Sequence, residues 1–155
     1  MRALGRHLMA VSAAGLVACS SNAQATPFAI ACTGIAKFSH KLGGNPSERT
    51  YKLPKQVYVF DEQTKRVQLA LEPRQEFDDV CIRGGYLTDV MFSPGLITVR
   101  SEKKDYMCDF KVSRVSGEAS FFTHQDVRGG FHEIDWKMTC AKTQVPVFDP
   151  SKNKF

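Results

Sequence analysis

The sequence predicts an all-β protein, a small antiparallel eight-stranded barrel-like meander with two disulfides. Three observations support this fold class. From Phe28 onward, apolar and polar residues alternate with a period of two, which is typical of strands with one buried face. Turn-forming residues interrupt this alternation at short intervals, and no segment of useful length has a helical pattern. An even number of cysteines follows the first 25 residues. A barrel of this size is filled by side chains or holds one small ligand.

The alternation places the strands along the chain. We expect them at residues 28–38, 57–60, 67–71, 86–92, 96–101, 106–115, 119–124 and 131–140. The polar segment 73–85 is predicted to be a loop. Residues 26–145 then form the barrel-like domain, and residues 146–155 form an irregular C-terminal tail that lies over the barrel.

Four cysteines lie in the predicted domain: Cys32, Cys81, Cys108 and Cys140. An even number in an exported chain indicates two disulfides. No Cys-x-x-Cys pair is present and no histidine is near a cysteine in sequence, which argues against zinc. Cys32 and Cys140 belong to the apolar faces of the first and last strands, which a barrel makes neighbours. We therefore predict the pairs Cys32–Cys140 and Cys81–Cys108.

The first 25 residues have the order of a secretory signal peptide. A short cationic start is followed by an uncharged run at residues 8–18, which is too short to span a bilayer. Ala23-Gln24-Ala25 fits cleavage before Thr26 by an ordinary signal peptidase. We expect export to the periplasm.

An alternative processing route begins at a cysteine. Leu16-Val17-Ala18-Cys19 resembles the lipobox of bacterial lipoproteins, in which the thiol accepts the lipid. Residues 1–18 would then be the signal, and Cys19 would anchor the protein to the outer membrane. This lipid is the only membrane attachment that the sequence predicts.

The charge of the chain indicates a solvated surface. The formal net charge is +5, and loss of Arg2 and Arg6 with the leader leaves +3. The basic residues are scattered among acids, whereas a nucleic-acid groove needs clustered cations and stacking aromatic residues. We predict no nucleic-acid partner.

Two histidines flank the turn at residues 126–130. If His124 and His132 pair directly, both imidazoles project from one sheet face and, with Asp126, could ligate a metal. The interpretation that we favour is a pair of polar residues at the barrel rim. We predict neither a metal nor another cofactor.

Acidic residues raise the question of acid–base catalysis. Paired carboxylates catalyse only where a shared, partly buried site separates their pKa values. Asp78 and Asp79 lie in a polar loop, and Glu133 and Asp135 alternate on an outer strand face, so all four are expected to be solvated. The chain also has no nucleophile elbow, phosphate loop or zinc-protease helix. We predict that it is not an enzyme.

Three phenylalanines gather near one hairpin. Phe121 and Phe131 are expected off the inner face, with Phe122 beside them. The C-terminal tail is predicted to cover them. Left uncovered, they would form an apolar patch for a partner.

Two resemblances extend these predictions. The chain contains three motifs: Phe28-x-x-x-Cys32-x-Gly34, Val112-Ser113-Arg114-Val115-Ser116-Gly117, and Cys140 with a Pro/Phe-rich stretch that ends Asn153-Lys154-Phe155. Together they resemble a group of small, exported, uncharacterised proteobacterial proteins. This resemblance spans most of the mature chain and implies the fold and an envelope location.

The chain is also loosely similar to the membrane-bound C-type lysozyme inhibitors. Those are exported eight-stranded barrels, often lipoproteins, in which a disulfide joins early and late strands. Their inhibitory motif begins Ser-Gly and has a tyrosine three positions after the glycine. Ser116 and Gly117 supply the start of this motif, but Ser120 stands at the tyrosine position.

The main functional hypothesis is a non-catalytic binding module of the cell envelope that contacts a protein partner. Its contact residues are predicted to be Ser116, Gly117, Ser120, His124 and His132, at one rim or hairpin face. One alternative is an inhibitor of a lysozyme-type cell-wall hydrolase. A second alternative is a carrier of a small apolar ligand.

Overall fold

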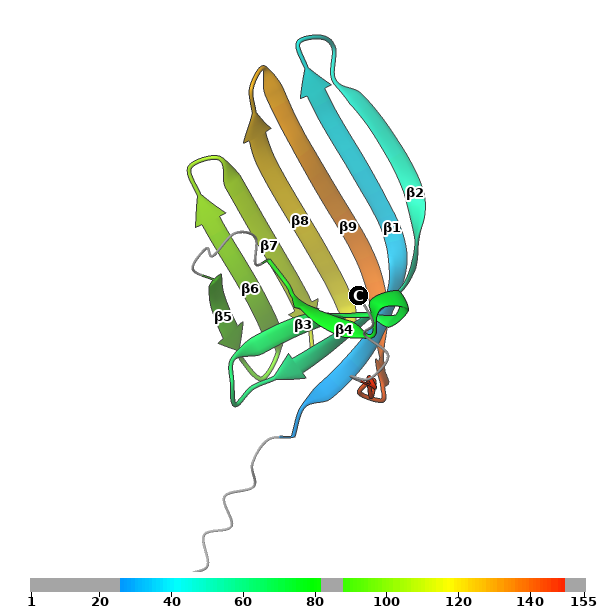
Figure 1. Cartoon of the computed structure of the whole chain (residues 1–155). Coiled ribbons are helices and arrows are strands. Elements are labelled where there is room, and N and C mark those ends of the chain that lie inside the picture. The colour runs from blue at the N-terminus through cyan, green and yellow to red at the C-terminus, as the bar shows by residue number, and fades with distance from the viewer. Residues whose placement is uncertain (1–25, 82–87, 150–155) are drawn as a thin grey trace, which may run out of the picture.

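In the part of the chain that the structure describes, nine antiparallel strands form one curled sheet (Figure 1). We describe residues 26–81 and 88–149 of a computed structural model. The strands are β1 (Phe28–Leu42), β2 (Ser47–Asp61), β3 (Arg66–Leu71), β4 (Glu76–Asp79), β5 (Thr88–Phe92), β6 (Leu96–Lys103), β7 (Tyr106–Ser113), β8 (Glu118–Val127) and β9 (Gly130–Thr143). A 3-10 turn, η1 (Glu72–Arg74), separates β3 from β4. The described residues contain no helix long and apolar enough to cross a membrane.

The strand order is β4-β3-β2-β1-β9-β8-β7-β6-β5. Strands consecutive in sequence pair throughout, except β4 and β5, which are the two edges of the sheet. The first and last strands pair with each other over their whole length, from Ala29 opposite Thr143 to Leu42 opposite Gly130. The sheet therefore has the connectivity of an up-and-down barrel that is open between β4 and β5.

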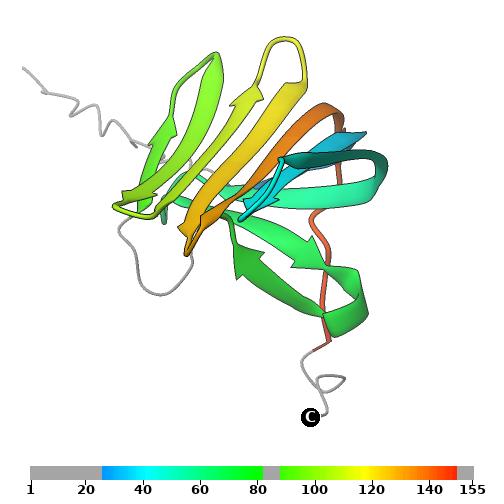
Figure 2. The same cartoon turned by 90° about the horizontal axis from the view of Figure 1, so that it is seen from above.

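Curvature comes from a bend in β2. The register between β1 and β2 shifts between Cys32 and Gly34, as it does at a β-bulge, and a bulge bends its strand. Beyond the bend, β2 carries β3 and β4 across the concave side of the other strands (Figures 1 and 2). Gly34 also lets β1 approach β9 closely, because a Cβ there would collide with the carbonyl oxygen of Lys137.

The main hydrophobic core lies on the concave, inner face. Tyr58 and Phe110 pack at its centre, with ring centroids 4.8 Å apart. Ile97, Val99 and Phe60 around them are at most 1% exposed. A smaller cluster of Ala29, Val57, Val59 and Ala70 lies on the outer face of β1, β2 and β3. The core is thus packed in the middle of the half-barrel.

The predicted fold class is confirmed, and so are both disulfides. Cys32 joins Cys140 across β1 and β9, with Cα atoms 4.0 Å apart. Cys81 follows β4 and joins Cys108 on β7, with Cα atoms 5.5 Å apart. This second bridge ties the end of β4 to the opposite half of the sheet, across the open seam.

The structure also adds to the prediction. Residues 76–79 of the predicted loop 73–85 form β4, one strand more than the eight predicted. β2 begins at Ser47, ten residues before the predicted strand, because its first half is exposed on both faces and has no alternation. The leader 1–25, which includes Cys19, and residues 150–155 lie outside the described residues.

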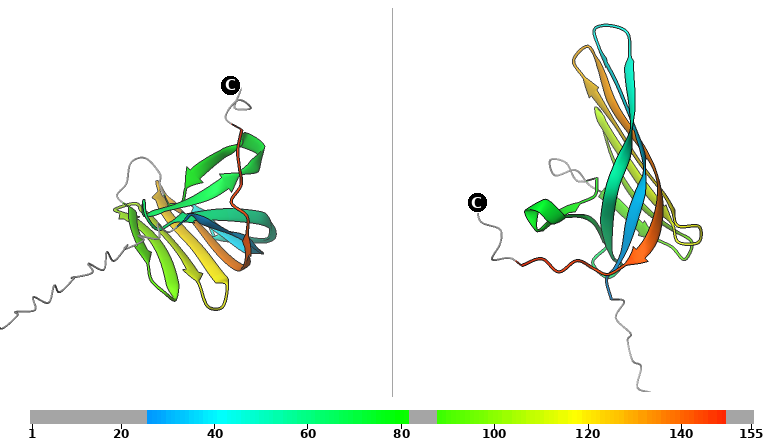
Figure 3. Two further views of the ribbon diagram at one scale, coloured as in Figure 1. Left: turned by 90° about the horizontal axis from the view of Figure 1, so that it is seen from below. Right: turned by 90° about the vertical axis from the view of Figure 1, so that its right-hand side faces the viewer.

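The C-terminal tail covers a different surface from the predicted one. The described part of the tail runs beside β3 and β4 (Figure 3). Val145 and Phe148 pack on the outer-face cluster, and the ring of Phe148 lies 4.6 Å from that of Phe77. Phe121 is not an outer residue: it packs on the inner core with its ring 4.8 Å from Trp136. Within the described residues, the prediction that the tail covers the three phenylalanines near the β8–β9 hairpin is therefore wrong.

Candidate functional site

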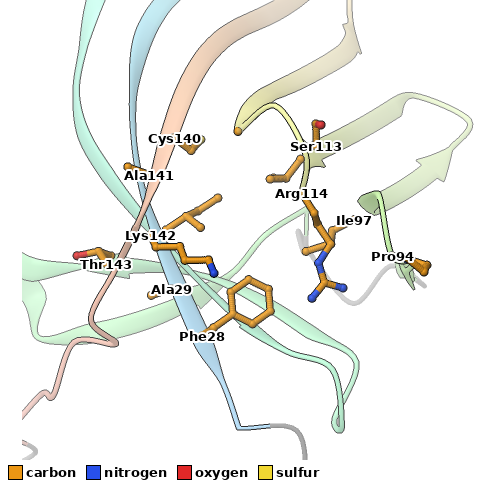
Figure 4. A pocket seen from close by; sticks show the side chains of 13 residues that line it. Phe28, Ala29, Pro94, Ile97, Ser113, Arg114, Cys140, Ala141, Lys142 and Thr143 are labelled. Carbon is orange, nitrogen blue, oxygen red and sulfur yellow. The ribbon is translucent and has the colours of Figure 1, made fainter.

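A pocket of about 680 Å³ opens at one end of the half-barrel, where β1 begins and β9 ends (Figure 4). We call it the end pocket. Its lining includes Phe28, Ile30, Ile97, Val112, Arg114 and Lys142. These residues come from both halves of the chain, because β1 and β9 face β6 and β7 across the concave side.

The floor of the end pocket is apolar. Ile30, Ile97 and Val112 point to the inner face and are at most 8% exposed. All three occupy inward positions on their strands, and the period of two delivers them to the same side of the sheet. The floor continues directly into the packed core.

Arg114 forms one wall of the end pocket. Its Nη2 lies 2.7 Å from Glu62 Oε1, and its Nη1 donates to the carbonyl oxygen of Ser93 at 3.2 Å. The guanidinium also lies over the ring of Phe28, 5.4 Å from the centroid. Glu62 therefore compensates the charge of Arg114, and the several contacts fix its position.

Lys142 supplies a second cation at the mouth. It pairs with Ile30 on β1 and shares the inner face with Cys140, two residues earlier. Figure 4 shows its ammonium and the guanidinium of Arg114 on either side of the Phe28 ring in that view. Among the described residues, no carboxylate forms an ion pair with Lys142. This charge is available to an anion.

Gly117 closes the pocket between β7 and β8. Its φ of +71° lies in the left-handed region, and its carbonyl oxygen accepts a 2.7 Å hydrogen bond from the backbone N–H of Cys140. A Cβ at this position would be 2.8 Å from the Cys140 carbonyl oxygen. Only glycine meets both requirements without strain. The predicted site residue Gly117 thus has a structural role beside the end pocket.

The arrangement suits one chemical class. An apolar floor favours a hydrocarbon group, at about 0.8 kcal/mol for each buried CH₂. The ammonium of Lys142, which no carboxylate of the described residues pairs with, favours an anionic head group. The combination matches the chemistry of a small anionic amphiphile.

The other predicted contact residues are not brought together. The Oγ of Ser116 contacts Glu118 within its own turn, at 3.2 Å from the carboxylate. Ser120 lies on the outer face of β8, opposite Lys111 and Lys137.

The two predicted histidines lie on opposite sheet faces. The register pairs His124 with Glu133 and His132 with Gln125, so the direct pair assumed for a shared metal site does not form. His124 instead contacts Asp126 and Glu133 on the outer face, at 3.3 and 3.4 Å. No group of three or more metal-ligating side chains occurs in the described part of the chain.

The acidic residues have separate surroundings. Asp79 accepts hydrogen bonds from the guanidinium of Arg66, the shortest at 2.7 Å, whereas Asp78 is exposed. This contact raises the pKa of Arg66. Asp135 faces Lys37 across β9 and β1. None of these carboxylates lines the end pocket.

Sequence reasoning missed the residues of the end pocket. Phe28, Arg114 and Lys142 are far apart in the chain and meet only after β1 has paired with β9. One signal was present: Lys142 continues the alternation of Ile134, Trp136, Met138 and Cys140, so a basic residue occupies an inner position.

The fold and the end pocket together define the structural class of this protein: it is a disulfide-linked half-barrel with a pocket at one end. Comparisons with family models, with curated proteins and with solved structures found no match for this chain.

Proposed function

We propose that the chain is an exported, non-catalytic binding protein of the cell envelope and that its end pocket binds a small anionic amphiphile such as a fatty acid. The observation that carries the proposal is the ammonium of Lys142, without an ion-pair partner among the described residues, at the mouth of an apolar pocket of about 680 Å³. Ligand pockets commonly have volumes of roughly 300–1,000 Å³ and combine apolar walls with a few placed polar groups. Two disulfides fit an oxidising compartment.

The proposal is a more specific form of the hypothesis that the protein carries a small apolar ligand, because it adds an anionic head group to the ligand. A purely apolar ligand would leave Lys142 without a role, whereas a carboxylate head group pairs with it. A hydrogen bond to a charged group contributes about 1.5–3 kcal/mol, and 1.4 kcal/mol is tenfold in affinity. The head group should therefore matter measurably.

Titration calorimetry of the mature, disulfide-linked protein tests this function. Dodecanoate should bind in a 1:1 ratio, and Lys142→Glu should weaken binding by at least about tenfold. Dodecanol, which has the same tail without the charge, should bind wild type and variant equally. Lys52→Glu is the matched control, since Lys52 is exposed and lies opposite Ile35, away from the pocket. Absence of dodecanoate binding to the wild type would reject the proposal.

The lysozyme-inhibitor alternative predicts a different result. Immobilised protein would retain lysozyme at low salt, and Gly117 and Ser120 variants would release it. A basic domain and a basic lysozyme repel each other, which slows encounter and lowers affinity. Retention by the wild type, lost in these variants, would favour inhibition over amphiphile binding.

A further inference from the structure

We propose a second binding site, for a single divalent transition-metal ion, at the other end of the half-barrel, between the imidazoles of His40 and His132. The register of β1 and β9 pairs these two residues directly. Their ring centroids are 6.2 Å apart and the ring planes are inclined by 28°. The proposal does not depend on the end pocket.

Neighbouring side chains hold the two imidazoles on the inner face. Phe38, two residues before His40, has its ring 5.5 Å from His40 and 6.1 Å from His132. The Oγ of Ser47 lies 2.9 Å from Nδ1 and 3.1 Å from Nε2 of His40, and one hydroxyl leaves a nitrogen of the ring for another partner. Both histidines are half-buried. The rings are therefore confined near one another but still reached by solvent.

This geometry suits a metal between the rings. Neutral imidazole nitrogen is the commonest protein ligand for transition metals, at about 2.0–2.1 Å for Zn²⁺. Side chains with solvent access rotate on the picosecond-to-nanosecond timescale, so one nitrogen from each ring can turn toward a common ion. Water would complete the coordination.

The charges around the histidine pair indicate the kind of ion. On the inner face, Gln125 lies opposite His132, and Arg49 lies opposite Phe38. The nearby acids Glu48 and Glu133 are paired with Ser39, which points to the outer face. Ca²⁺ and Mg²⁺ need oxygen ligands, mostly carboxylates, which this face does not offer. Nitrogen ligands favour Cu²⁺, Ni²⁺ and Zn²⁺, with Cu²⁺ bound most tightly.

The hairpin of β8 and β9, which carries His132, also provides a matched control, His124. His124 lies on the opposite face of β8, where Asp126 and Glu133 occupy its two ring nitrogens. A metal held by any surface histidine would respond to loss of His124. A metal held by the proposed pair would respond only to His40 and His132.

Copper titration of the full disulfide-linked protein tests the site. Trp136, the only tryptophan, lies four residues from His132 on the same strand, roughly 14 Å away, so bound Cu²⁺ should quench its fluorescence. We expect saturation at one ion per chain. His40→Ala and His132→Ala should each weaken binding at least about tenfold, and His124→Ala should leave it unchanged. Electron paramagnetic resonance should show two coordinated nitrogens.

Several results would overturn the proposal. They are absence of saturable Cu²⁺ binding to the wild type, an equal loss in His124→Ala, or a spectrum without nitrogen ligands. Because a variant could fold poorly, a wild-type measurement stands beside them. Substoichiometric Ni²⁺ should broaden the imidazole NMR signals of His40 and His132 before those of His124, and the reverse order would reject the site.

Discussion

The two ends of the half-barrel are built on the same pair of strands and differ in what covers them. At the pocket end, Ile30 and Cys32 on β1 are buried by the core. At the opposite end, which we call the hairpin end because the β1–β2 and β8–β9 turns lie there, Phe38 and His40 on the same face of β1 are only half-buried. β1 and β9 extend past the part of the sheet that β3 and β4 cover (Figure 1).

The difference shows that a single register of β1 and β9 places different kinds of side chain on the inner face at the two ends. Every second residue of β1 and β9 faces inward, whichever end it occupies. Where other strands cover that face, buried inward residues such as Ile30, Cys32 and Met138 are apolar or disulfide-bonded. Beyond that cover, the half-buried inward residues include the ring of Phe38 and the imidazoles of His40 and His132, which tolerate solvent. Three pairs of variants test this contrast.

The disulfides should show the largest effect. Cys32–Cys140, near the pocket end, closes a separation of 108 residues, and Cys81–Cys108 closes one of 27. In the chain-entropy model, their loss costs about 4.8 and about 3.5 kcal/mol of unfolding free energy, respectively. Urea unfolding of the two double Cys→Ala variants measures this. Equal losses would mean that the two bridges constrain the unfolded chain alike.

Two glycines with positive φ should differ by their surroundings. Gly117→Ala places a Cβ 2.8 Å from the Cys140 carbonyl, whereas Gly43→Ala, in the β1–β2 turn at the hairpin end, meets nothing within 4 Å. Both variants place a Cβ on a left-handed backbone, at about 1 kcal/mol of strain, and only Gly117→Ala adds a collision, for a total of about 2–3 kcal/mol. Thermal unfolding of both variants should separate them. A larger loss in Gly43→Ala would contradict the packing at the pocket end.

Ion pairs should show the smallest contrast. Arg114 and Glu62, at the pocket end, are each about one-third exposed, at 32% and 31%. Arg114→Met should cost about 1 kcal/mol, since it also loses the bond to Ser93. Lys37 and Glu48, toward the hairpin end, are about half exposed, so Lys37→Met should leave the urea midpoint unchanged. A measurable loss in Lys37→Met would show that this end is more rigid than its exposure indicates.

The alternation of side chains was enough to predict the fold class and both disulfides. Cys32 and Cys140 belong to strands with unmistakable period-two patterns, so their faces were fixed before the pairing was known. β4 could not be predicted in the same way. Three of its four residues, Glu76, Asp78 and Asp79, are acidic, and as an edge strand it has no need of an alternating pattern.

The pairing register of β8 and β9 determines which side chains share a face, and the sequence did not determine this register. The β8–β9 turn contains two residues, with Val127 opposite Gly130, and Gly129 takes the positive φ of +86°. A one-residue change in register moves every side chain to the other face. The sequence predicts His124 as the partner of His132 on β8, but the observed partner on β8 is Gln125. On β1, the other neighbour of β9, His132 pairs with His40.

The link between Cys32 and Cys140 also determines how the molecule would respond to a mechanical load. Both chain ends leave the sheet at the same end, since Ala29 is opposite Thr143. A pull on the two ends would separate only the last few residue pairs before the force reached the covalent bond between the sulfur atoms. The 107 residues between these cysteines would carry no tension. A chain tethered at its N-terminus and drawn by a partner at its C-terminus would keep its folded sheet intact.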